Sequence, residues 1–412
     1  MKDSGIEWVG EIPKEWSVNR AKYCFVNTKE IAGCRSDRYE RLALTMNGVI
    51  KRSKEDSNGL QPEKFETYQI LRPDELVFKL IDLQNVSTSR VGLSPYLGLV
   101  SPAYIILKSN KRVLPAFAEK YFLMLWKNQI FNALGDAGVR SNLNSKDLLE
   151  LSIPFPPIEE QQRIAEFLDR ACGKIDGLKE NIQSQIDTLE QYKRSVITEA
   201  VTHGLNSSAP MKDSGIPWVG KTPEYWKVGR IGGLYELRNQ KVSDKDFMPL
   251  SVTMKGILPQ LETAAKTNDG DNRKLVRVGD FAINSRSDRR GSCGISDYDG
   301  SVSLINTILK PRNRMNVKYY NWLFHTPMFA DEFYKWGHGI VDDLWTTNWS
   351  EMKRISIPLP PLGEQQEIAD YLDNKCAEIE HIIADKKTQL ETLDGYKKSL
   401  IYEYVTGKKE VG

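Results

Sequence analysis

The first candidate for chemistry is a phosphate-binding pattern near the middle of the chain. Gly215 to Thr222 reads GIPWVGKT and satisfies the GxxxxGK[ST] spacing of a P-loop. A P-loop needs a buried strand before it and a helix after it, so that helical N–H groups face the phosphates. Here a polar linker, Ser207 to Pro210, precedes the pattern and Pro223 follows at once. We predict no nucleotide site, and a nucleotide-dependent enzyme built on Lys221 is kept as an alternative.

Basic side chains among small polar residues form the second candidate, a surface for nucleic acid. The segment Asn284 to Ser292 (NSRSDRRGS) holds Arg286, Arg289 and Arg290. Arginine reads guanine through two hydrogen bonds, and both Arg and Ser bind phosphates. A solvated basic loop is the competing interpretation for each residue. In the first half of the chain, Lys79 and Arg90 stand at the corresponding place, and the weaker DNA-binding candidates are Lys51, Arg52 and Arg140.

Residue patterns typical of catalytic centres are missing from the sequence. There is no NPP[FYW] or DPP[FYW] motif, no HExxH, no GxSxG and no nuclease-like cluster of carboxylates and lysine. The five cysteines lack CxxC spacing and the four histidines are dispersed, so we expect neither a disulfide framework nor a metal site. With no signal peptide and no run of 18 apolar residues, we expect no membrane partner and a cytoplasmic location.

The elements that would position these side chains occur twice. The first ten residues, MKDSGIEWVG, return as MKDSGIPWVG at Met211 to Gly220, nine of ten identical. SIPFPPIEEQQRIAEFLD, from Ser152, recurs as SIPLPPLGEQQEIADYLD, from Ser356, twelve of eighteen identical. The offsets are 210 and 204 residues, too long for a solenoid repeat. The sequence therefore predicts a tandem domain duplication.

Between these matching ends the two halves diverge and keep only fragments in common. LALTMNGVI (Leu42 to Ile50) resembles LSVTMKGIL (Leu250 to Leu258), and such short β-branched runs predict strands. Apolar-periodic stretches at Ala116 to Leu134 and Val317 to Tyr334 predict helices. Each half is expected to be an α+β domain with a shared scaffold and different surface loops.

A coiled-coil seam is predicted downstream of each proline-rich segment. Apolar residues there step by alternating four and three residues, the spacing of a heptad. About 44 helical residues would span roughly 66 Å. The chain order makes two such helices antiparallel if they pair; the alternative is that each packs on its own domain. The predicted seam consists of Ile164, Leu168, Ile175, Leu178, Ile182, Leu189, Ile368, Leu372, Ile379, Ile382, Leu393 and Leu400.

Net charge alternates along the same division. Residues 1–157 and 211–361 carry formal charges of +4 and +5, whereas 158–210 and 362–412 carry −3 and −4. This suits a polyanion ligand on the globular parts and a protein partner on the helices, although ordinary surface variation would give similar values.

Taken together, these motifs resemble the specificity subunit of type I restriction–modification systems. The resemblance rests on GIxWVGxxPxxW at Gly5 and Gly215, IPxPPxxEQQxIAxxLD at Ile153 and Ile357, and YK[RK]S at Tyr192 and Tyr396. It covers essentially the whole chain, and the doubled arrangement makes it specific.

The resemblance implies an α+β fold with two similar globular target-recognition domains separated by a long antiparallel two-helix coiled coil, a tandem duplication with pseudo-two-fold symmetry. It implies these parts: recognition domains at 1–157 and 211–361, spacer helices at 158–205 and 362–406, and a linker at 206–210.

A chain of this kind is not an enzyme and is implied to read an asymmetric bipartite site in double-stranded DNA. The implied partners are two methyltransferase subunits, which methylate adenine with S-adenosylmethionine, and restriction subunits, which cleave with ATP and Mg²⁺. This chain would hold no cofactor itself. A stand-alone DNA-binding regulator is the alternative, against which the acidic helices and the missing helix-turn-helix pattern argue.

Overall fold

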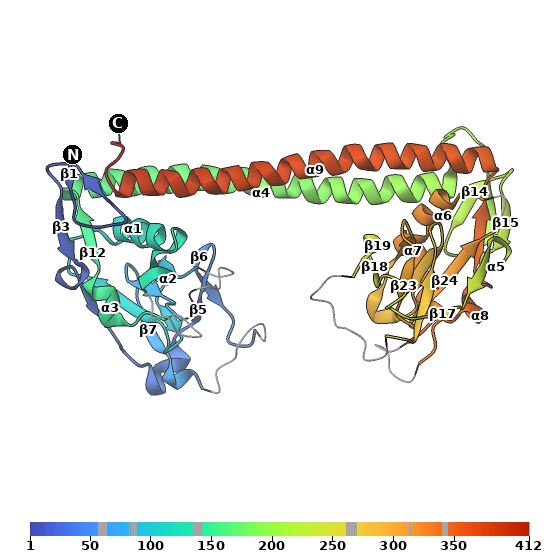
Figure 1. The fold of residues 1–412 in the computed structure, drawn as a ribbon. Coiled ribbons are helices and arrows are strands. Elements are labelled where there is room, and N and C mark those ends of the chain that lie inside the picture. Colours follow the sequence, from blue (N-terminus) through green and yellow to red (C-terminus); the bar gives the residue numbers. More distant parts are fainter. Residues whose placement is uncertain are drawn as a thin grey trace. The chain divides into compact units, whose positions relative to one another are not determined.

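The structure is a computed structural model that describes residues 1–56, 64–81, 83, 89–134, 142–260, 270–312, 315–339 and 345–411. The chain divides into two compact units (Figure 1). The first unit comprises Met1–Ile182 and Lys387–Gly412, and the second comprises Gln183–Lys386. Each unit therefore combines one globular part with one stretch of each long helix.

In the first unit, most of the β-strands precede a small group of helices, and one strand follows that group. The strands are β1 (Lys2–Asp3), β2 (Glu11–Ile12), β3 (Ser17–Arg20), β4 (Phe25–Asn27), β5 (Arg41–Thr45), β6 (Gly48–Arg52), β7 (Gln69–Leu71), β8 (Leu76–Phe78), β9 (Val91–Leu93), β10 (Gly98–Val100), β11 (Ile105–Ser109) and β12 (Ser152–Phe155). The helices are α1 (Pro115–Lys127), α2 (Ile130–Leu134), α3 (Ser145–Glu150) and the start of α4 (Ile158–His203).

The second unit repeats this order. Its strands are β13 (Met211–Ile216), β14 (Gly220–Pro223), β15 (Lys227–Arg230), β16 (Tyr235–Arg238), β17 (Lys241–Val242), β18 (Leu250–Thr253), β19 (Gly256–Pro259), β20 (Arg273–Val276), β21 (Phe281–Asn284), β22 (Cys293–Ile295), β23 (Gly300–Val302), β24 (Asn306–Pro311) and β25 (Ser356–Leu359). Its helices are α5 (Ile231–Leu234), α6 (Val317–Phe324), α7 (Pro327–Lys335), α8 (Trp349–Met352) and the start of α9 (Leu362–Val405).

The sheets have equivalent strand orders in the two units. The order β4-β11-β8-β9 of the first unit matches β16-β24-β21-β22 of the second. The pairs β1-β2 and β12-β3 match β13-β14 and β15-β25. The strands predicted around Leu42 and Leu250 form the hairpins β5-β6 and β18-β19. Both units thus have mixed helix and strand content built on one scaffold.

Each predicted helix after the sheets is divided into two. In the first unit the break falls between α1 and α2, where Gln129 adopts a φ of 60°. In the second unit α7 begins at Pro327, and the Thr326 hydroxyl accepts a hydrogen bond from the N–H of Phe329. The apolar periodicity did not show these breaks because both segments of each pair contribute to the same core.

The first unit contains an antiparallel contact between α4 and α9. The ring centroids of Phe167 and Tyr404 lie 4.4 Å apart. Asp176 pairs with Lys397 at 2.7 Å, and Lys179 pairs with Asp394. Positions rise along α4 as they fall along α9, so the two segments run in opposite directions.

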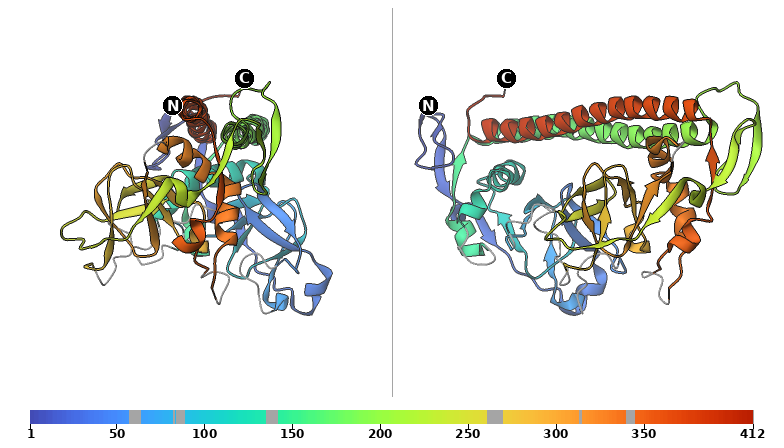
Figure 2. Two further views of the ribbon diagram at one scale, coloured as in Figure 1. Left: turned by 90° about the vertical axis from the view of Figure 1, so that its right-hand side faces the viewer. Right: turned by 45° about the vertical axis from the view of Figure 1, so that its right-hand side comes forward.

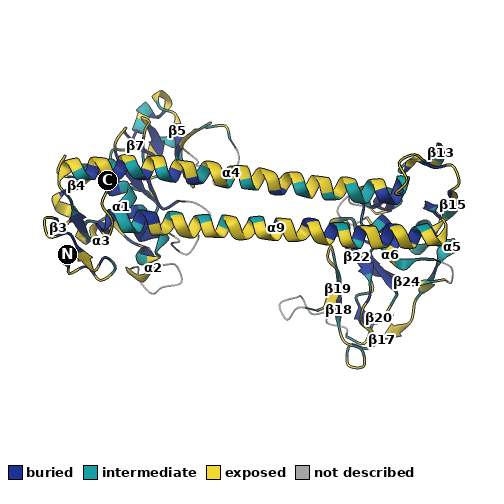
Figure 3. Cartoon of the chain, turned by 90° about the horizontal axis from the view of Figure 1, so that it is seen from above, coloured by how far each residue is buried: buried dark blue, intermediate teal, exposed yellow. Residues whose placement is uncertain are grey.

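In the second unit the other ends of the same helices pair in the same sense. Lys386 donates a hydrogen bond to the side-chain oxygen of Gln185, and Lys193 pairs with Glu380. Ala200 and Val201 of α4 pack in the same hydrophobic core as Ile368 and Leu372 of α9. Figure 3 shows exposed residues along most of both helices.

Two members of the predicted seam are wrong. Leu178 is 56% exposed and Ile382 is 44% exposed, whereas Ile186 and Ile383 are buried. Cys172 is buried as well, so the buried positions of α4 run Ile164, Leu168, Cys172, with two successive steps of four. A straight helix has 3.6 residues per turn, and its buried stripe drifts away from a strict heptad. The remaining seam members are buried or half-buried.

A buried aromatic cluster ties each globular part to the long helices. In the first unit Phe78, Tyr121 and Phe122 pack in one core with Leu168 and Leu400. In the second unit the equivalent core gathers Tyr235, Tyr319 and Phe329 with Val201 and Leu372. Helix α1 lies between the long helices and the sheets of its unit (Figure 1). Within the described ranges, no helix is long and apolar enough to cross a membrane.

Candidate nucleic-acid interface

A junction of tryptophan, glutamate and glutamine fixes each globular part to the start of a long helix. The Trp16 indole donates to Glu160 at 3.0 Å, and the Trp226 indole donates to Glu364 at 2.9 Å. Both indoles are buried, and each carboxylate lies in the first turn of its helix, where the helix dipole favours negative charge. The repeated ends of the sequence therefore position the domains.

The buried glutamine that follows each of these positions completes the junction. Gln161 accepts from the N–H of Leu114 at 2.8 Å and donates to the carbonyl of Pro156 at 2.9 Å. Gln365 accepts from the N–H of Asn316 at 2.9 Å and donates to the carbonyl of Pro360 at 2.8 Å. Each side chain satisfies buried backbone groups on two segments, which explains why the EQQ motif is repeated.

In the second unit a hairpin and the arginine segment line one hollow of about 670 Å³. The hairpin β18-β19 packs against β22 so closely that a Cβ on Gly294 would lie 2.8 Å from the Cα of Gly256. This contact brings the hairpin tip next to the loop that precedes β22. The lining includes groups that can donate to or accept from bases and phosphates: Ser251, Thr253, Gln260, Asn284, Arg289, Arg290 and Asn306.

The three predicted arginines of this segment are close to acidic groups. Arg286 lies 3.0 Å from Asp288, and Arg289 lies 3.8 Å from the same carboxylate. Arg290 pairs with Asp331 and lies 5.6 Å from the ring centroid of Tyr334. All three side chains are more than a third exposed, so a polyanion can compete for them.

The predicted basic residues of the first unit do not converge in the same way. Lys51 pairs with Glu40 at 2.6 Å, and that hydrogen bond raises the pKa of Lys51 above its usual range. Arg52 pairs with Asp56 at 2.7 Å. Both line a separate hollow of about 600 Å³.

Two other predicted residues of the first unit flank the strand pair β8-β9. Lys79 is half-buried, and its N–H donates to the carbonyl of Arg90 at 3.0 Å. Arg90 has a relative exposure of 0%, so it does not present its guanidinium to a ligand in this structure. Arg140 lies outside the described residues.

The P-loop-like pattern lies on a β-hairpin. Gly215 belongs to β13 and Lys221 to β14, and these strands pair antiparallel. Figure 2 shows this light-green hairpin directly after the end of α4. No helix begins at Lys221, so the convergent N–H groups that cradle a phosphate are missing from this segment. Across the described ranges, no group of three or more His, Cys, Asp or Glu residues is arranged to hold a metal.

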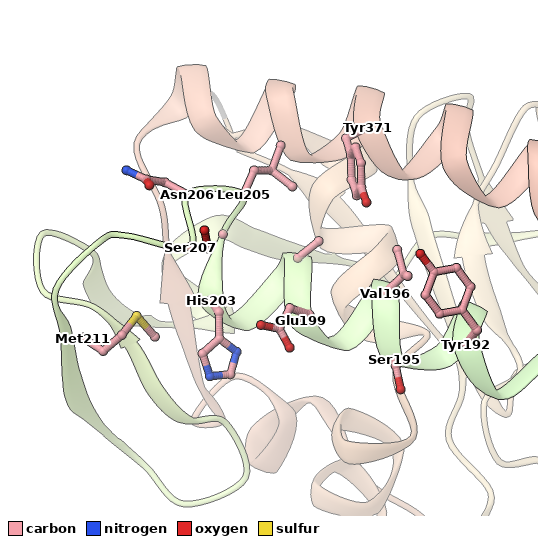
Figure 4. A pocket seen from close by; sticks show the side chains of 12 residues that line it. Tyr192, Ser195, Val196, Glu199, His203, Leu205, Asn206, Ser207, Met211 and Tyr371 are labelled. Atoms are coloured by element: carbon pink, nitrogen blue, oxygen red, sulfur yellow. The ribbon is translucent and has the colours of Figure 1, made fainter.

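Another hollow, of about 520 Å³, lies at the end of α4 in the second unit (Figure 4). Tyr192, Glu199 and His203 reach it from α4, and Tyr371 reaches it from α9. Tyr192 is exposed, as is Tyr396, its equivalent in the repeat. Exposed aromatic side chains on a helix are typical of protein contacts.

Sequence reasoning missed the polar residues that complete the hollow beside the arginines. Gln260 follows β19, and Asn306 begins β24. Neither belongs to a basic cluster or a motif, and only the packing of two separate sheets brings them to the hollow that Arg289 lines. The repeated fragment Leu250 to Leu258 was the available signal, because it placed similar strand-forming residues at the same point in both halves.

Comparison with known proteins gives the class to which this fold and surface belong. The family described as "Type I restriction modification DNA specificity domain" matches residues 57–188 and 223–392. The chain belongs to this family, and the two matched ranges reflect its duplication. The resemblance drawn from the repeated motifs is therefore confirmed.

Individual relatives match over nearly the full length of the chain. A protein named the MjaX type I restriction enzyme specificity subunit, from Methanocaldococcus jannaschii, is 24% identical over 98% of this chain and 96% of its own. The EcoKI specificity subunit of Escherichia coli K12 is 20% identical, covering 85% of this chain and 81% of its own. A solved structure concerned with assembly of the type I restriction–modification system shares the fold, with a TM-score of 0.71, 14% identity, and coverage of 97% and 100%.

Proposed function

We propose that this chain is the specificity subunit of a type I restriction–modification complex and that each globular part reads one half of a bipartite DNA site. The proposed recognition domains are residues 1–157 and 211–361, and the linker 206–210 connects the first long helix to the second domain. One observation carries the proposal: the same scaffold and junction occur twice, but with different surface groups around the β5-β6 and β18-β19 hairpins. Different surfaces on one scaffold suit two different half-sites.

The long helices are proposed as the spacer between the two recognition domains, with bounds of 158–205 and 362–406. Antiparallel contacts occur in each unit, from Phe167–Tyr404 in the first to Lys193–Glu380 in the second. A two-helix coiled coil of this kind would relate the domains by an approximate two-fold axis. The spacing between half-sites would then depend on helix length.

The helices are also proposed as the docking surface for partner subunits. Tyr192 and Tyr396 are exposed and equivalent in the repeat, so the chain offers the same aromatic group twice. Two methyltransferase subunits, one at each tyrosine, fit this arrangement. These subunits would hold S-adenosylmethionine, and restriction subunits would hold ATP and Mg²⁺.

Co-expression with a methyltransferase subunit of a type I system tests the proposal. The tagged chain should recover that subunit, and adenine in DNA should be methylated only when both proteins are present. Tyr192→Ala with Tyr396→Ala should weaken recovery, whereas Glu180→Gln, at an exposed position of α4 outside the hollow around Tyr192, serves as a control. A chain that binds one continuous DNA site and recovers no methyltransferase would instead be a stand-alone regulator.

A further inference from the structure

The β5-β6 and β18-β19 hairpins end in the same four-residue turn, Thr-Met-x-Gly. In the first unit the Thr45 hydroxyl donates to the carbonyl of Gly48 at 3.0 Å and accepts from the N–H of Asn47 at 3.2 Å. In the second unit Thr253 makes the same bonds to Gly256 and Lys255, at 2.9 and 3.0 Å. The two turns are therefore fixed in the same way, although most of the surrounding sequence has diverged.

A methionine lies at the tip of each turn with its side chain in solvent. Met46 is 53% exposed and Met254 is 72% exposed, the highest value among the exposed large apolar side chains of the described ranges. Two-residue hairpin connections favour Asn, Asp and Gly, and nothing in this turn requires an apolar side chain. The threonine hydroxyl and the backbone make the hydrogen bonds of each turn, so the turn itself does not require the methionine.

Each hairpin packs closely against a glycine of a neighbouring strand, β9 in the first unit and β22 in the second. A Cβ on Gly92 of β9 would lie 2.6 Å from a side-chain carbon of Leu44, just as Gly294 of β22 meets Gly256. In the second unit Met254 lines the same hollow as Arg289 and Arg290. A supported hairpin tip thus lies beside the groups proposed to bind phosphates and bases.

We propose that each hairpin tip enters the major groove and that its methionine packs against the methyl group of a thymine in the half-site. This inference rests on the proposed function. The major groove admits a two-stranded β-ribbon, and the thymine methyl is the apolar group that it presents. The unbranched thioether of methionine adapts to such a contact. Met46 then reads the half-site of the first domain and Met254 that of the second.

The test uses the full complex with its methyltransferase subunits, and measures dissociation constants for a cognate and a scrambled duplex at several salt concentrations. Met254→Ala should lower the cognate-to-scrambled ratio about tenfold and leave the salt dependence unchanged, since an apolar contact releases no counterions. Val278→Ala and Val26→Ala remove exposed apolar groups elsewhere in the same domains and serve as controls. Met46→Ala should act like Met254→Ala, but on the other half-site.

The methylated motif of each variant then locates the contact. Met254→Ala should relax one position that carries thymine. Replacing that thymine by deoxyuridine should weaken the wild-type complex about as much as the mutation does, with no further loss in the variant. A ratio within twofold of the wild type, equal loss on both duplexes, or a relaxed position without thymine would overturn the inference. A wild-type complex with no preference for a bipartite duplex would instead overturn the proposed function.

Discussion

The junctions and the reading surfaces of the two halves have diverged to different extents. At the junctions, Trp16–Glu160 and Trp226–Glu364 differ by only 0.1 Å, and the glutamine bonds follow the same pattern. At the surfaces, the second half exposes three arginines where the first half has a buried Arg90. Duplication has kept the groups that set geometry and the methionine at each hairpin tip, while the charged groups that face a ligand have changed. The result would be two recognition domains that join the long helices in the same way but bind different half-sites.

Exchanging a whole domain should have the largest effect. Residues 1–150 would be replaced by a second copy of 211–354, which keeps an equivalent junction at both long helices. Both domains would then read the same half-site, so the target should become an interrupted palindrome. Methylation mapping checks this. The reciprocal chimaera with two first domains is the matched control and should give the other palindrome; retention of the original asymmetric target would contradict domain-by-domain reading.

Lengthening the helices should change the gap and leave both half-sites intact. One heptad inserted after Gln183 and another after Lys387 adds roughly 10 Å at 1.5 Å per residue, about three base pairs of B-DNA. Such a shift also rotates one half-site around the duplex by roughly 100°, so binding should weaken unless the DNA twists. The methylated motif reports the gap. A full-activity variant with an unchanged gap would show that helix length does not set the spacing.

Trp16→Ala should destabilise the first half, and Trp226→Ala should destabilise the second half by a similar amount. Trp16 and Trp226 are buried, and replacing a buried Trp by Ala costs about 3–5 kcal/mol. Hydrogen exchange during urea unfolding would assign the loss to one half in each variant. Trp345→Ala, at a partly exposed tryptophan outside the junctions, should cost much less. If either variant lowered the free energy of unfolding by less than about 1 kcal/mol, the two junctions would not stabilise their domains in the same way.

Removing one arginine of the second half should have a smaller effect on DNA binding. Arg289→Ala or Arg290→Ala should weaken affinity by about 1–3 kcal/mol if a base contact is lost, or reduce the salt slope by about one if a phosphate contact is lost. Asp331→Asn frees Arg290 from its partner and should strengthen non-specific binding slightly. Binding titrations at several salt concentrations distinguish these results. Variants with unchanged affinity and slope would remove the segment from the interface.

The sequence predicted the repeated scaffold well because its signals were local or duplicated. The strands around Leu42 and Leu250, the long helices and the start of α4 near Pro157 followed from runs of residue type and proline position, although the turn that divides each strand run into a hairpin was not predicted. The seam was less accurate, since Leu178 fits a heptad but the helix keeps 3.6 residues per turn. Burial of Arg90 and the pairing of Arg290 with Asp331, 41 residues away, depend on how the sheet folds. No local pattern encodes those contacts.

Mapping methylated adenines in DNA from cells that express this chain with its methyltransferase subunit tests the central claim most directly. The two domains have different surface groups but equivalent junctions to the long helices. The account therefore predicts one asymmetric motif, made of two short specified parts separated by a gap of constant length. A strain expressing the methyltransferase subunit alone should show no such motif. A continuous palindromic motif from the intact chain would contradict the account.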